Sequence, residues 1–385
     1  MKEKFLRELA DIQTGPFGSQ LHKEDYVADG TPIVTVEHLG NKMFSEQNLP
    51  RVSNTDKNRL KKYVLKQGDI VFSRVGSVDR CSYVDQKHDG WMFSGRCLRV
   101  CPTSEIDSEY LYYYFCLEET KQFVRNIAVG ATMPSINTKL LGEVVVTFPE
   151  LEQQKRISGI LSAIDSKIEV NQKINDNLSD LLQTIYQGQF GKVGLANNCG
   201  ILADICSYSK DKIEISKLSL DTYYSTENML PEKSGAVKAT SLPTTSQTTA
   251  CHKGDTLISN IRPYFKKIVY CEDDCGCSTD VLCFKPVHPR YTAYLFSTLY
   301  ADSFFDFMVA GAKGTKMPRG DKQQIMTYPV VLPSEKDLSE FNSVATPILT
   351  QIYSNRTESE RLSAIRDTLL PKLILGEIDV SSIQL

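Results

Sequence analysis

The clearest pattern in the chain is a heptad spacing of apolar residues in two stretches, each of which follows a proline. In the first stretch, residues 151 to about 187, the apolar members of one seam position are Ile157, Ile164, Leu178 and Ile185. Adding 184 to each number gives the second series, Phe341, Ile348, Leu362 and Leu369. Apolar residues at this spacing predict helices that bury the seam against a partner helix. We expect two helices of about 35 residues, each about 50 Å long, paired as an antiparallel coiled coil.

One seam position in each stretch is polar. Asn171 interrupts the first apolar series, and Asn355 interrupts the second at the corresponding position. A buried asparagine weakens packing in such a seam but favours one alignment, because its amide needs a partner. We predict that Asn171 pairs with Asn355, or that a shared helix register places each of them. The alternative is two solvent-facing asparagines where the heptads break.

Three residues predict where the two helices bend or end. Pro347 lacks a backbone N–H and is expected to kink or interrupt the second helix. Gly188 and Gly376 stand just beyond the last apolar positions, where helix C-caps favour glycine.

The rest of the chain alternates short β-rich runs with turn residues, and it is duplicated. Met133-Pro134 recurs as Met317-Pro318 at an offset of 184, and Gly68-Asp69 recurs as Gly254-Asp255 at an offset of 186. Repetition over half a chain predicts two similar domains. We therefore expect an α+β protein in which two similar mixed α/β heads are separated by the two long helices, with a pseudo-twofold relation between the halves. The expected parts are a head at residues 1–150, a helical spacer at 151–192, a second head at 193–333 and a second spacer at 334–385.

Composition places this architecture in a broad class. The 385 residues are 41% hydrophobic and 24% charged, which is typical of a globular protein with more than one domain. The sequence contains no apolar run long enough to span a membrane, and its start lacks the apolar segment of a signal peptide, so we expect a cytoplasmic protein. The net charge of −3 argues against indiscriminate binding of nucleic acid but leaves room for a local basic face.

Eleven cysteines invite a reading as disulfides or as a metal site. The number is odd and the chain is long, so we expect reduced thiols. Four of them cluster, Cys271, Cys275, Cys277 and Cys283, and zinc is the alternative to buried thiols there. Their spacing is not that of a standard finger or ribbon, and the first half has no matching set, so we expect no metal.

The candidate binding residues are basic and polar side chains in the loops of the two heads. In the first head they are Arg51, Lys57, Arg59, Lys61 and Lys62, followed by Arg74, Ser77 and Arg80 after the Gly-Asp strand. In the second head, after the equivalent strand, they are Asn260, Arg262, Tyr264, Lys266 and Lys267. Such side chains contact phosphates, and Arg can read guanine bidentately. For any one of them a solvated face is the favoured interpretation, and the parallel placement in both heads sets nucleic-acid binding beside it as an equal alternative.

A further loop carries the Met-Pro pair of each head. It is expected to act as a packing hinge or to present Thr132, Asn137, Lys316 and Arg319 to nucleic acid. Upstream of it, residues 108–127 and 291–308 are helical and rich in Tyr and Phe, which we interpret as core rather than as a platform for stacking bases.

Several catalytic motifs are absent from the sequence. It has no Pro-Pro pair, hence no Asp/Asn-Pro-Pro-Tyr motif of an amino-methyltransferase, and no nucleotide-binding glycine motif or H-E-x-x-H. This favours binding over catalysis, and we expect no catalytic residue. Two alternatives stay open: a stand-alone DNA-modifying enzyme, or a duplicated scaffold protein.

Longer motifs carry a family resemblance. They are Leu-Ala-Asp-Ile-Gln-Thr-Gly-Pro-Phe-Gly-Ser-Gln-Leu from residue 9, Leu-Lys-Gln-Gly-Asp-Ile-Val-Phe-Ser-Arg-Val-Gly from residue 65, Phe-Pro-Glu-Leu-Glu-Gln-Gln-Lys-Arg-Ile from residue 148 and Leu-Leu-Pro-Lys-Leu-Ile-Leu-Gly-Glu-Ile from residue 369. In this order the chain resembles the specificity subunit of a Type I restriction–modification system. The second head lacks the Gly-Pro-Phe-Gly opening, so its loops are less closely matched.

The resemblance implies a non-catalytic subunit whose heads are target-recognition domains. Each head would read one half of a bipartite double-stranded DNA target, and the helices would set the spacing and dock two adenine methyltransferase subunits. Two motor-nuclease subunits can join such a complex. The chain itself would bind no cofactor, since S-adenosylmethionine and, for restriction, ATP and Mg²⁺ belong to the partner subunits.

Overall fold

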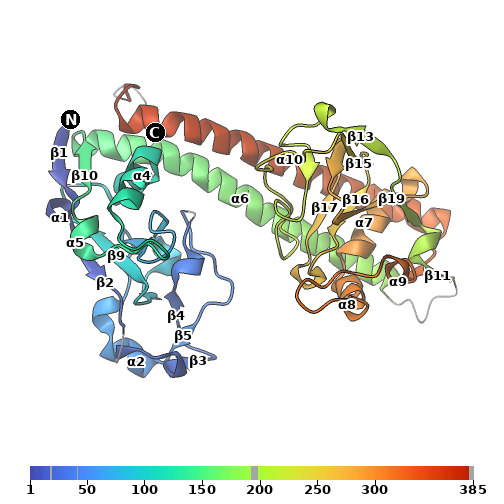
Figure 1. Ribbon diagram of the computed structural model, residues 1–385, viewed down its shortest axis with the longest axis horizontal. Coiled ribbons are helices and arrows are strands. Elements are labelled where there is room, and N and C mark those ends of the chain that lie inside the picture. Colours follow the sequence, from blue (N-terminus) through green and yellow to red (C-terminus); the bar gives the residue numbers. More distant parts are fainter. Residues whose placement is uncertain (18–19, 41, 192–197, 381–385) are drawn as a thin grey trace. The chain divides into compact units, whose positions relative to one another are not determined.

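The structure is a computed structural model that describes residues 1–17, 20–40, 42–191 and 198–380. The chain forms two compact units (Figure 1). Unit 1 comprises Met1–Glu169 with Ser359–Leu385, and unit 2 comprises Val170–Glu358. Each unit therefore holds one head and its own stretch of both long helices.

The larger sheet of unit 1 is antiparallel, in the order β2-β9-β6-β7. Its strands are β2 (Ala10–Thr14), β9 (Cys97–Pro102), β6 (Ile70–Ser73) and β7 (Cys81–Tyr83). The smaller sheet is formed by β3 (Tyr26–Val27), β5 (Arg51–Val52), β4 (Thr31–Val34) and β8 (Met92–Phe93), and a separate ladder by β1 (Lys2–Phe5) and β10 (Val145–Phe148). The short helices are α1 (Leu6–Leu9), α2 (Asn54–Arg59), α3 (Ser108–Cys116), α4 (Glu118–Ile127) and α5 (Thr138–Leu141).

Unit 2 repeats this plan, with a larger antiparallel sheet in the order β12-β19-β16-β17. Its strands are β12 (Cys206–Tyr208), β19 (Val281–Pro286), β16 (Thr256–Ser259) and β17 (Ile268–Tyr270). The smaller sheet contains β13 (Lys212–Glu214), β15 (Gln247–Cys251), β18 (Cys275–Cys277) and β14 (Tyr223–Tyr224), and the ladder pairs β11 (Cys199–Ile201) with β20 (Pro329–Val331). The short helices are α7 (Thr292–Tyr300), α8 (Asp302–Ala310) and α9 (Lys322–Ile325).

The matching strand orders confirm the internal repeat that the residue offsets predict. The larger sheets have the same connectivity, and each smaller sheet contains one parallel pair, β4 with β8 and β14 with β18. The heads differ beside that pair: β5 joins β4 in unit 1, whereas β15 joins β18 in unit 2. The two heads thus share the larger sheet and its helices.

The predicted long helices are α6 (Leu151–Phe190) and α10 (Glu335–Ile374). In unit 2 they run antiparallel, because Asn171 contacts Asn355 at one end of the pair and Phe190 packs on Phe341 at the other. In unit 1 the first part of α6 lies beside the last part of α10, where Arg366 is bonded to Asp165. Of the helices in the described part of the chain, none is long and apolar enough to span a membrane.

The predicted C-cap at Gly188 and the predicted interruption at Pro347 are wrong, whereas a kink at Pro347 stays a prediction. Helix α6 continues through Gly188 to Phe190. The buried Phe190 ring packs against Phe341 and Tyr294, and these contacts stabilise the longer helix. Helix α10 passes through the exposed Pro347, since buried residues on both sides, including Ile348, hold the helix together despite the missing N–H. Gly376 does follow the end of α10, with the left-handed conformation (φ +77°) expected of a C-cap glycine.

The aromatic helices belong to the core, as the sequence predicts, although each stretch is split into two helices. In unit 1, Tyr110, Tyr113 and Phe115 of α3 are fully buried under the larger sheet. In unit 2, Tyr294 of α7 and Phe304 of α8 take the same role. These rings anchor the sheet and are not available to stack bases.

The clustered cysteines are part of a second core in unit 2. Cys271, Cys275, Cys277 and Cys283 are buried with Leu257 and Val269, and the Sγ atoms of Cys271 and Cys275 lie 3.7 Å apart. All eleven cysteines are free thiols. In the described residues, no group of three or more His, Cys, Asp or Glu side chains is placed to hold a metal ion.

Candidate nucleic-acid interface

Each head brings two of the predicted loops together into one surface, which we term the loop pair. In unit 1, residues 74–80 lie against residues 129–136: the Gly76 N–H donates to the Pro134 carbonyl at 2.8 Å, and the Ile136 N–H to the Arg74 carbonyl at 2.9 Å. In unit 2, residues 260–267 meet residues 313–320 in the same way, and the Arg262 N–H donates to the Pro318 carbonyl at 2.8 Å. The Met-Pro loop is therefore joined to the loop after the Gly-Asp strand in both heads.

The repeated Gly-Asp motif fixes the strand that leads into the loop pair. Gly68 and Gly254 both have φ +92°, a conformation that favours glycine. The buried carboxylates of Asp69 and Asp255 each accept a backbone N–H at 2.8 Å, from Lys66 and from His252. Burial raises the pKa of both carboxyls above the usual range for aspartate. The motif is thus a structural turn and carries no chemistry of its own.

The two loop pairs share a backbone frame but present different side chains. The position of Arg74 in unit 1 is taken by Asn260 in unit 2, and their N–H groups donate to equivalent carbonyls, those of Arg96 and Asp280, at 2.8 Å. Gly76 likewise corresponds to Arg262. One scaffold can therefore present two different sets of hydrogen-bonding groups.

Unit 2 holds unused hydrogen-bonding capacity in this frame. Asn260 is only 6% exposed, and its Oδ1 has no hydrogen-bond partner within the described residues. The buried Nε of Arg262 likewise has no hydrogen-bond partner within the described residues. Buried polar groups are nearly always paired, so each of these atoms calls for a physical reason, such as a ligand.

Arg262 also stores backbone strain that its counterpart avoids. Its φ of +51° is left-handed, whereas the equivalent Gly76 adopts φ +76° without a Cβ to clash. The duplicated frame requires a left-handed residue here, and only the first head uses glycine. A strained residue retained in place of glycine points to a role for its side chain.

Exchanging the residue type at these two positions is expected to change stability in opposite directions. Arg262→Gly should raise the free energy of unfolding by up to about 1 kcal/mol, since it removes strain and an unpaired Nε. Gly76→Ala should lower it by about 1 kcal/mol, although an added Cβ would meet no atom within 4 Å, because φ +76° disfavours any Cβ. Urea unfolding of both variants measures the pair; two losses of equal size would show that Arg262 stores no strain.

The remaining cations of the first head are only partly free for a ligand. Arg51 donates to the Gly30 carbonyl at 2.9 Å, and Arg59 pairs with Asp56 at 2.8 Å. Lys57 is half-buried, whereas Lys61, Lys62, Ser77 and Arg80 are exposed. Arg51 and Arg59 therefore have structural partners, and the exposed members are the better candidates.

The opening motif of the chain, which sequence reasoning did not place in the site, lies beside Arg74. The Arg74 guanidinium is 5.7 Å from the centre of the Phe17 ring, which is 60% exposed, and donates to the Gly95 carbonyl at 3.1 Å. Gly15 passes so close to Ser94 that a Cβ would meet its carbonyl oxygen at 2.1 Å. The Gly-Pro-Phe sequence was thus the available signal: its glycine permits a close approach that brings Phe17 to the loop pair.

Of the candidate residues in the second head, some have structural partners and others are exposed. Lys266 pairs with Asp302 at 2.8 Å, Lys267 donates to the Thr226 carbonyl at 2.6 Å, and Arg319 pairs with Asp280 at 3.1 Å. Tyr264 and Lys316 are exposed. In the Met-Pro loop of unit 1, Thr132 is exposed but Asn137 caps α5 through its side chain, as Asp321 caps α9.

The two seam asparagines are buried, at 1% and 6% exposure, and they contact each other across the helix pair. The Asn171 Nδ2 donates to the backbone carbonyl of Asn355 at 3.3 Å and to the Glu358 carboxylate at 2.8 Å. The Asn355 Nδ2 donates instead to the Asn175 Oδ1 at 2.9 Å. A polar network thus crosses the helix pair; its role in setting the register stays a prediction.

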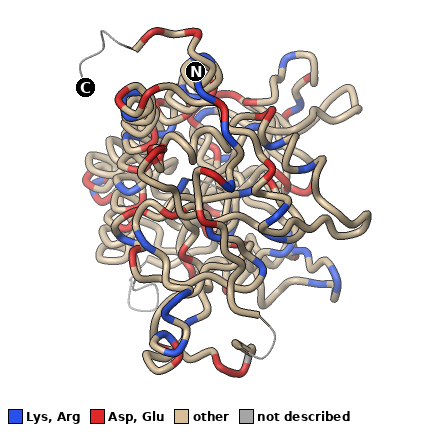
Figure 2. The backbone as a smooth tube through the Cα atoms, turned by 90° about the vertical axis from the view of Figure 1, so that its left-hand side faces the viewer, with Lys and Arg blue, Asp and Glu red and all other residues tan. Residues whose placement is uncertain are grey.

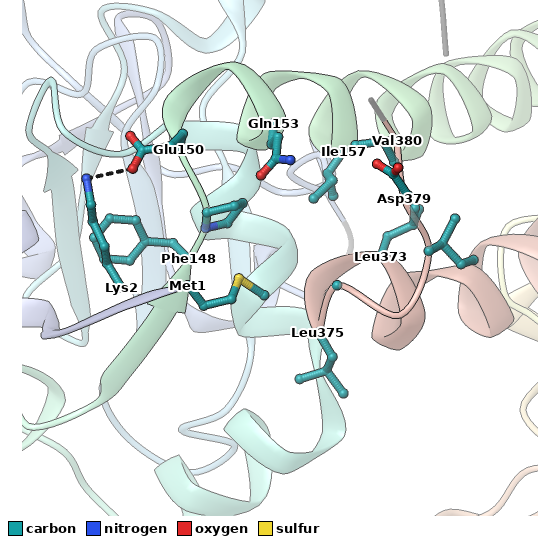
Figure 3. A pocket seen from close by; sticks show the side chains of 13 residues that line it. Met1, Lys2, Phe148, Glu150, Gln153, Ile157, Leu373, Leu375, Asp379 and Val380 are labelled. Atoms are coloured by element: carbon teal, nitrogen blue, oxygen red, sulfur yellow. Dashed lines mark ion pairs between the residues drawn. The ribbon is translucent and has the colours of Figure 1, made fainter. Parts of the chain in front are cut away.

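Neither overall charge nor a cavity marks a competing site. Figure 2 shows Lys and Arg interspersed with Asp and Glu along the backbone. An open cavity of about 420 Å³ lies in unit 1, where Phe148, Ile157 and Leu373 line it and Lys2 pairs with Glu150 at 3.0 Å (Figure 3). None of the candidate residues in the described chain lines this cavity, so the loop pairs remain the candidate interface.

Comparisons with known proteins concern the family and the fold. Residues 1–180 match the family model of the Type I restriction modification DNA specificity domain. The chain is 22% identical over 311 residues to the Type I restriction enzyme MjaIX specificity subunit of Methanocaldococcus jannaschii, covering 74% of this chain and 72% of that protein. It is 28% identical over 182 residues to the MjaVIII specificity subunit of the same organism, covering 45% and 41%. The crystal structure of a Type I restriction–modification S subunit from M. genitalium has the same fold, with a TM-score of 0.57 at 18% identity, covering 97% of this chain and 95% of that one.

Proposed function

Because the chain belongs to the Type I restriction–modification DNA specificity family, we propose that it is the non-catalytic subunit that reads a bipartite double-stranded DNA target. The duplicated loop pair carries this proposal, since one backbone frame presents different polar side chains in the two heads. Each head reads one half-site. Two readers linked by helices recognise two short DNA words separated by an unread gap, as half-site spacing follows protein spacing.

The side chains of the loop pairs suit both phosphate contacts and base reading. The exposed Lys316 contacts phosphates, and Arg319 does so on leaving Asp280; phosphate contacts give affinity without sequence information. Asn260 and Arg262 have unfilled hydrogen-bonding capacity, and these residue types pair bidentately with adenine and guanine, respectively. Because the Asn260 Oδ1 and the Arg262 Nε are buried, both side chains turn outward when DNA binds. In unit 1, Arg74 takes the position of Asn260, so the two heads favour different bases.

The long helices supply a surface for partner subunits. Exposed apolar residues recur along α6 and α10, namely Val170, Ile174, Leu181, Val344 and Ile365. Apolar side chains of this kind on helices favour docking of further helices. Two adenine methyltransferase subunits dock there and bring S-adenosylmethionine; motor-nuclease subunits, where present, bring ATP and Mg²⁺. The complex acts on DNA in the cytoplasm.

A charge removal tests DNA binding by the loop pair. Lys316→Ala in the chain assembled with its methyltransferase should weaken retention of target DNA by about tenfold and lower the salt slope by about one. Lys336→Ala on α10, also an exposed lysine, is the matched control and should change neither. Equal effects of the two variants would remove the loop pair from the DNA interface.

The rival functions give different results in the same preparation. A stand-alone enzyme would modify DNA when the purified chain receives S-adenosylmethionine or Mg²⁺ alone. A scaffold protein would assemble with partners but leave DNA retention unchanged. The proposal requires methylation that needs both the chain and its partner.

A further inference from the structure

Four strained residues lie together in unit 2. Glu232 (φ +51°), Lys233 (φ +60°), Arg262 (φ +51°) and Lys266 (φ +50°) are left-handed without being glycine, and in the described chain the other such residue is Asn48. Strain of this kind persists only where the surroundings hold it, and it concentrates at functional sites. Its concentration in two neighbouring segments marks one place in the head.

One of the two segments, residues 262–266, contains a short tip. The tip is the 3₁₀ turn Pro263–Phe265, which Arg262 and Lys266 flank. The Glu232 N–H donates to the Phe265 carbonyl at 2.8 Å, and the Lys233 N–H to the Lys266 carbonyl at 3.0 Å. These bonds fix the C-terminal end of the tip, and the Arg262 N–H, which donates to the Pro318 carbonyl at 2.8 Å, fixes its N-terminal end.

A carboxylate that binds both segments further stabilises the tip. The Nζ atoms of Lys233 and Lys266 both lie 2.8 Å from one oxygen of Asp302 at the start of α8. Hydrogen bonds from the two lysines lower the pKa of Asp302, so the carboxylate is charged at neutral pH. Both left-handed lysines are thus tied to the same helix.

The tip carries two exposed aromatic rings. Tyr264 is 46% exposed and Phe265 is 36% exposed, and their ring centres lie 4.7 Å apart. The cationic side chains of Arg262, Lys266 and Lys267 surround them in sequence. Buried aromatics would stabilise the fold, whereas exposed rings on a rigid, strained and basic tip fit a ligand with flat apolar faces and negative charge.

We propose that Tyr264 and Phe265 form an aromatic tip that stacks against DNA bases in the half-site read by unit 2. The inference rests on the proposed DNA-recognition function and adds a mode of contact to it. Every base offers a π-face, and apolar side chains inserted at a base step unstack it and bend the duplex. The rigid tip loses little conformational freedom on binding, because the backbone is already ordered.

In the described residues of unit 1, the loop after the Gly-Asp strand, residues 74–80, carries no aromatic pair equivalent to this tip. At the offset of 186 residues, Tyr264 and Phe265 correspond to Val78 and Asp79, and Val78 is buried. Stacking by this loop therefore distorts one half-site only, and the other is read without it.

The test compares variants of the tip in the assembled complex on duplex DNA that carries the motif methylated by the wild-type complex. Tyr264→Ala should weaken binding by about tenfold, and Tyr264→Phe should restore it, because the ring and not the hydroxyl stacks. In permanganate footprints, thymines made reactive by unstacking should lose that reactivity with Tyr264→Ala in one half-site and keep it in the other. Phe123→Ala removes an equally exposed ring of unit 1 and is expected to change nothing.

Each other outcome contradicts a defined part of this account. Wild-type complex that retains no target DNA overturns the proposed function itself. Wild-type binding with an unchanged Tyr264→Ala variant overturns the aromatic tip alone. An affinity loss with unchanged footprints overturns stacking, and loss of assembly with the methyltransferase assigns the tip to a protein contact instead.

Discussion

Inserting one heptad into both long helices is expected to lengthen the unread gap of the target by about three base pairs and to leave both half-sites unchanged. Seven residues add about 10 Å of helix, and base pairs are about 3.4 Å apart. The insertions belong between Glu169 and Val170 in α6 and between Glu358 and Ser359 in α10, where the two units meet in the chain. Every contact within each unit is then preserved.

The pairing of the helices supplies the control for this design. Asn171 and Glu358 are hydrogen-bonded at 2.8 Å, so the two insertion points lie side by side. The same heptad placed in α6 alone should shift the register and lower stability instead of lengthening the gap. Methylome sequencing reads the gap directly, and an unchanged gap in the double insertion would show that the helices do not set the spacing.

Asp165→Ala is expected to lower the free energy of unfolding of unit 1 by about 3 kcal/mol. The Asp165 carboxylate accepts from the Tyr113 hydroxyl of α3 at 2.5 Å and from the Arg366 guanidinium of α10 at 2.8 Å. It is largely buried on α6 and so joins three elements of the unit. Its removal leaves the Tyr113 hydroxyl without an acceptor and leaves the partly buried Arg366 guanidinium paired with Asp367 alone.

An exposed ion pair of the same unit is the matched control. Glu105 pairs with Lys4 at 2.6 Å, and both side chains are well exposed, so Glu105→Ala should cost less than about 1 kcal/mol. Urea unfolding monitored through the tyrosines of unit 1 measures both variants. Equal losses would mean that the Asp165 network does not hold α3 to the long helices.

Features that occur in both halves of the sequence predict the fold well, because both halves meet the same physical requirement. The heptad positions give α6 and α10 because a seam must be buried along its whole length, and the Gly-Asp pair recurs because both sheets need the same turn. Phe190 shows the limit of this reasoning. Its contacts with Phe341 and Tyr294 come from distant parts of unit 2, and they carry α6 beyond the glycine that local rules favour as its end.

The candidate site was less accessible to sequence reasoning because exposure and pairing depend on neighbours distant in the chain. Arg59 and Arg319 look alike as loop cations, but only the structure reveals their carboxylate partners. The strained conformations of Lys233 and Lys266 leave no trace in residue type, since left-handed positions usually favour glycine. For Arg262, the alignment with Gly76 in the repeat was an available signal, and the shared hydrogen bond to the Met-Pro loop explains it.

The central claim, that each head reads one half of a split DNA target, is tested most directly by methylome sequencing of a host carrying this chain and its methyltransferase partner. The comparison is between the intact chain and a chain whose residues 1–150 are replaced by the head of another family member. The account predicts methyl-adenine in both halves of a gapped motif, with one half changed by the replacement and the other retained. A change in both halves, or a motif that does not depend on the chain, would contradict it.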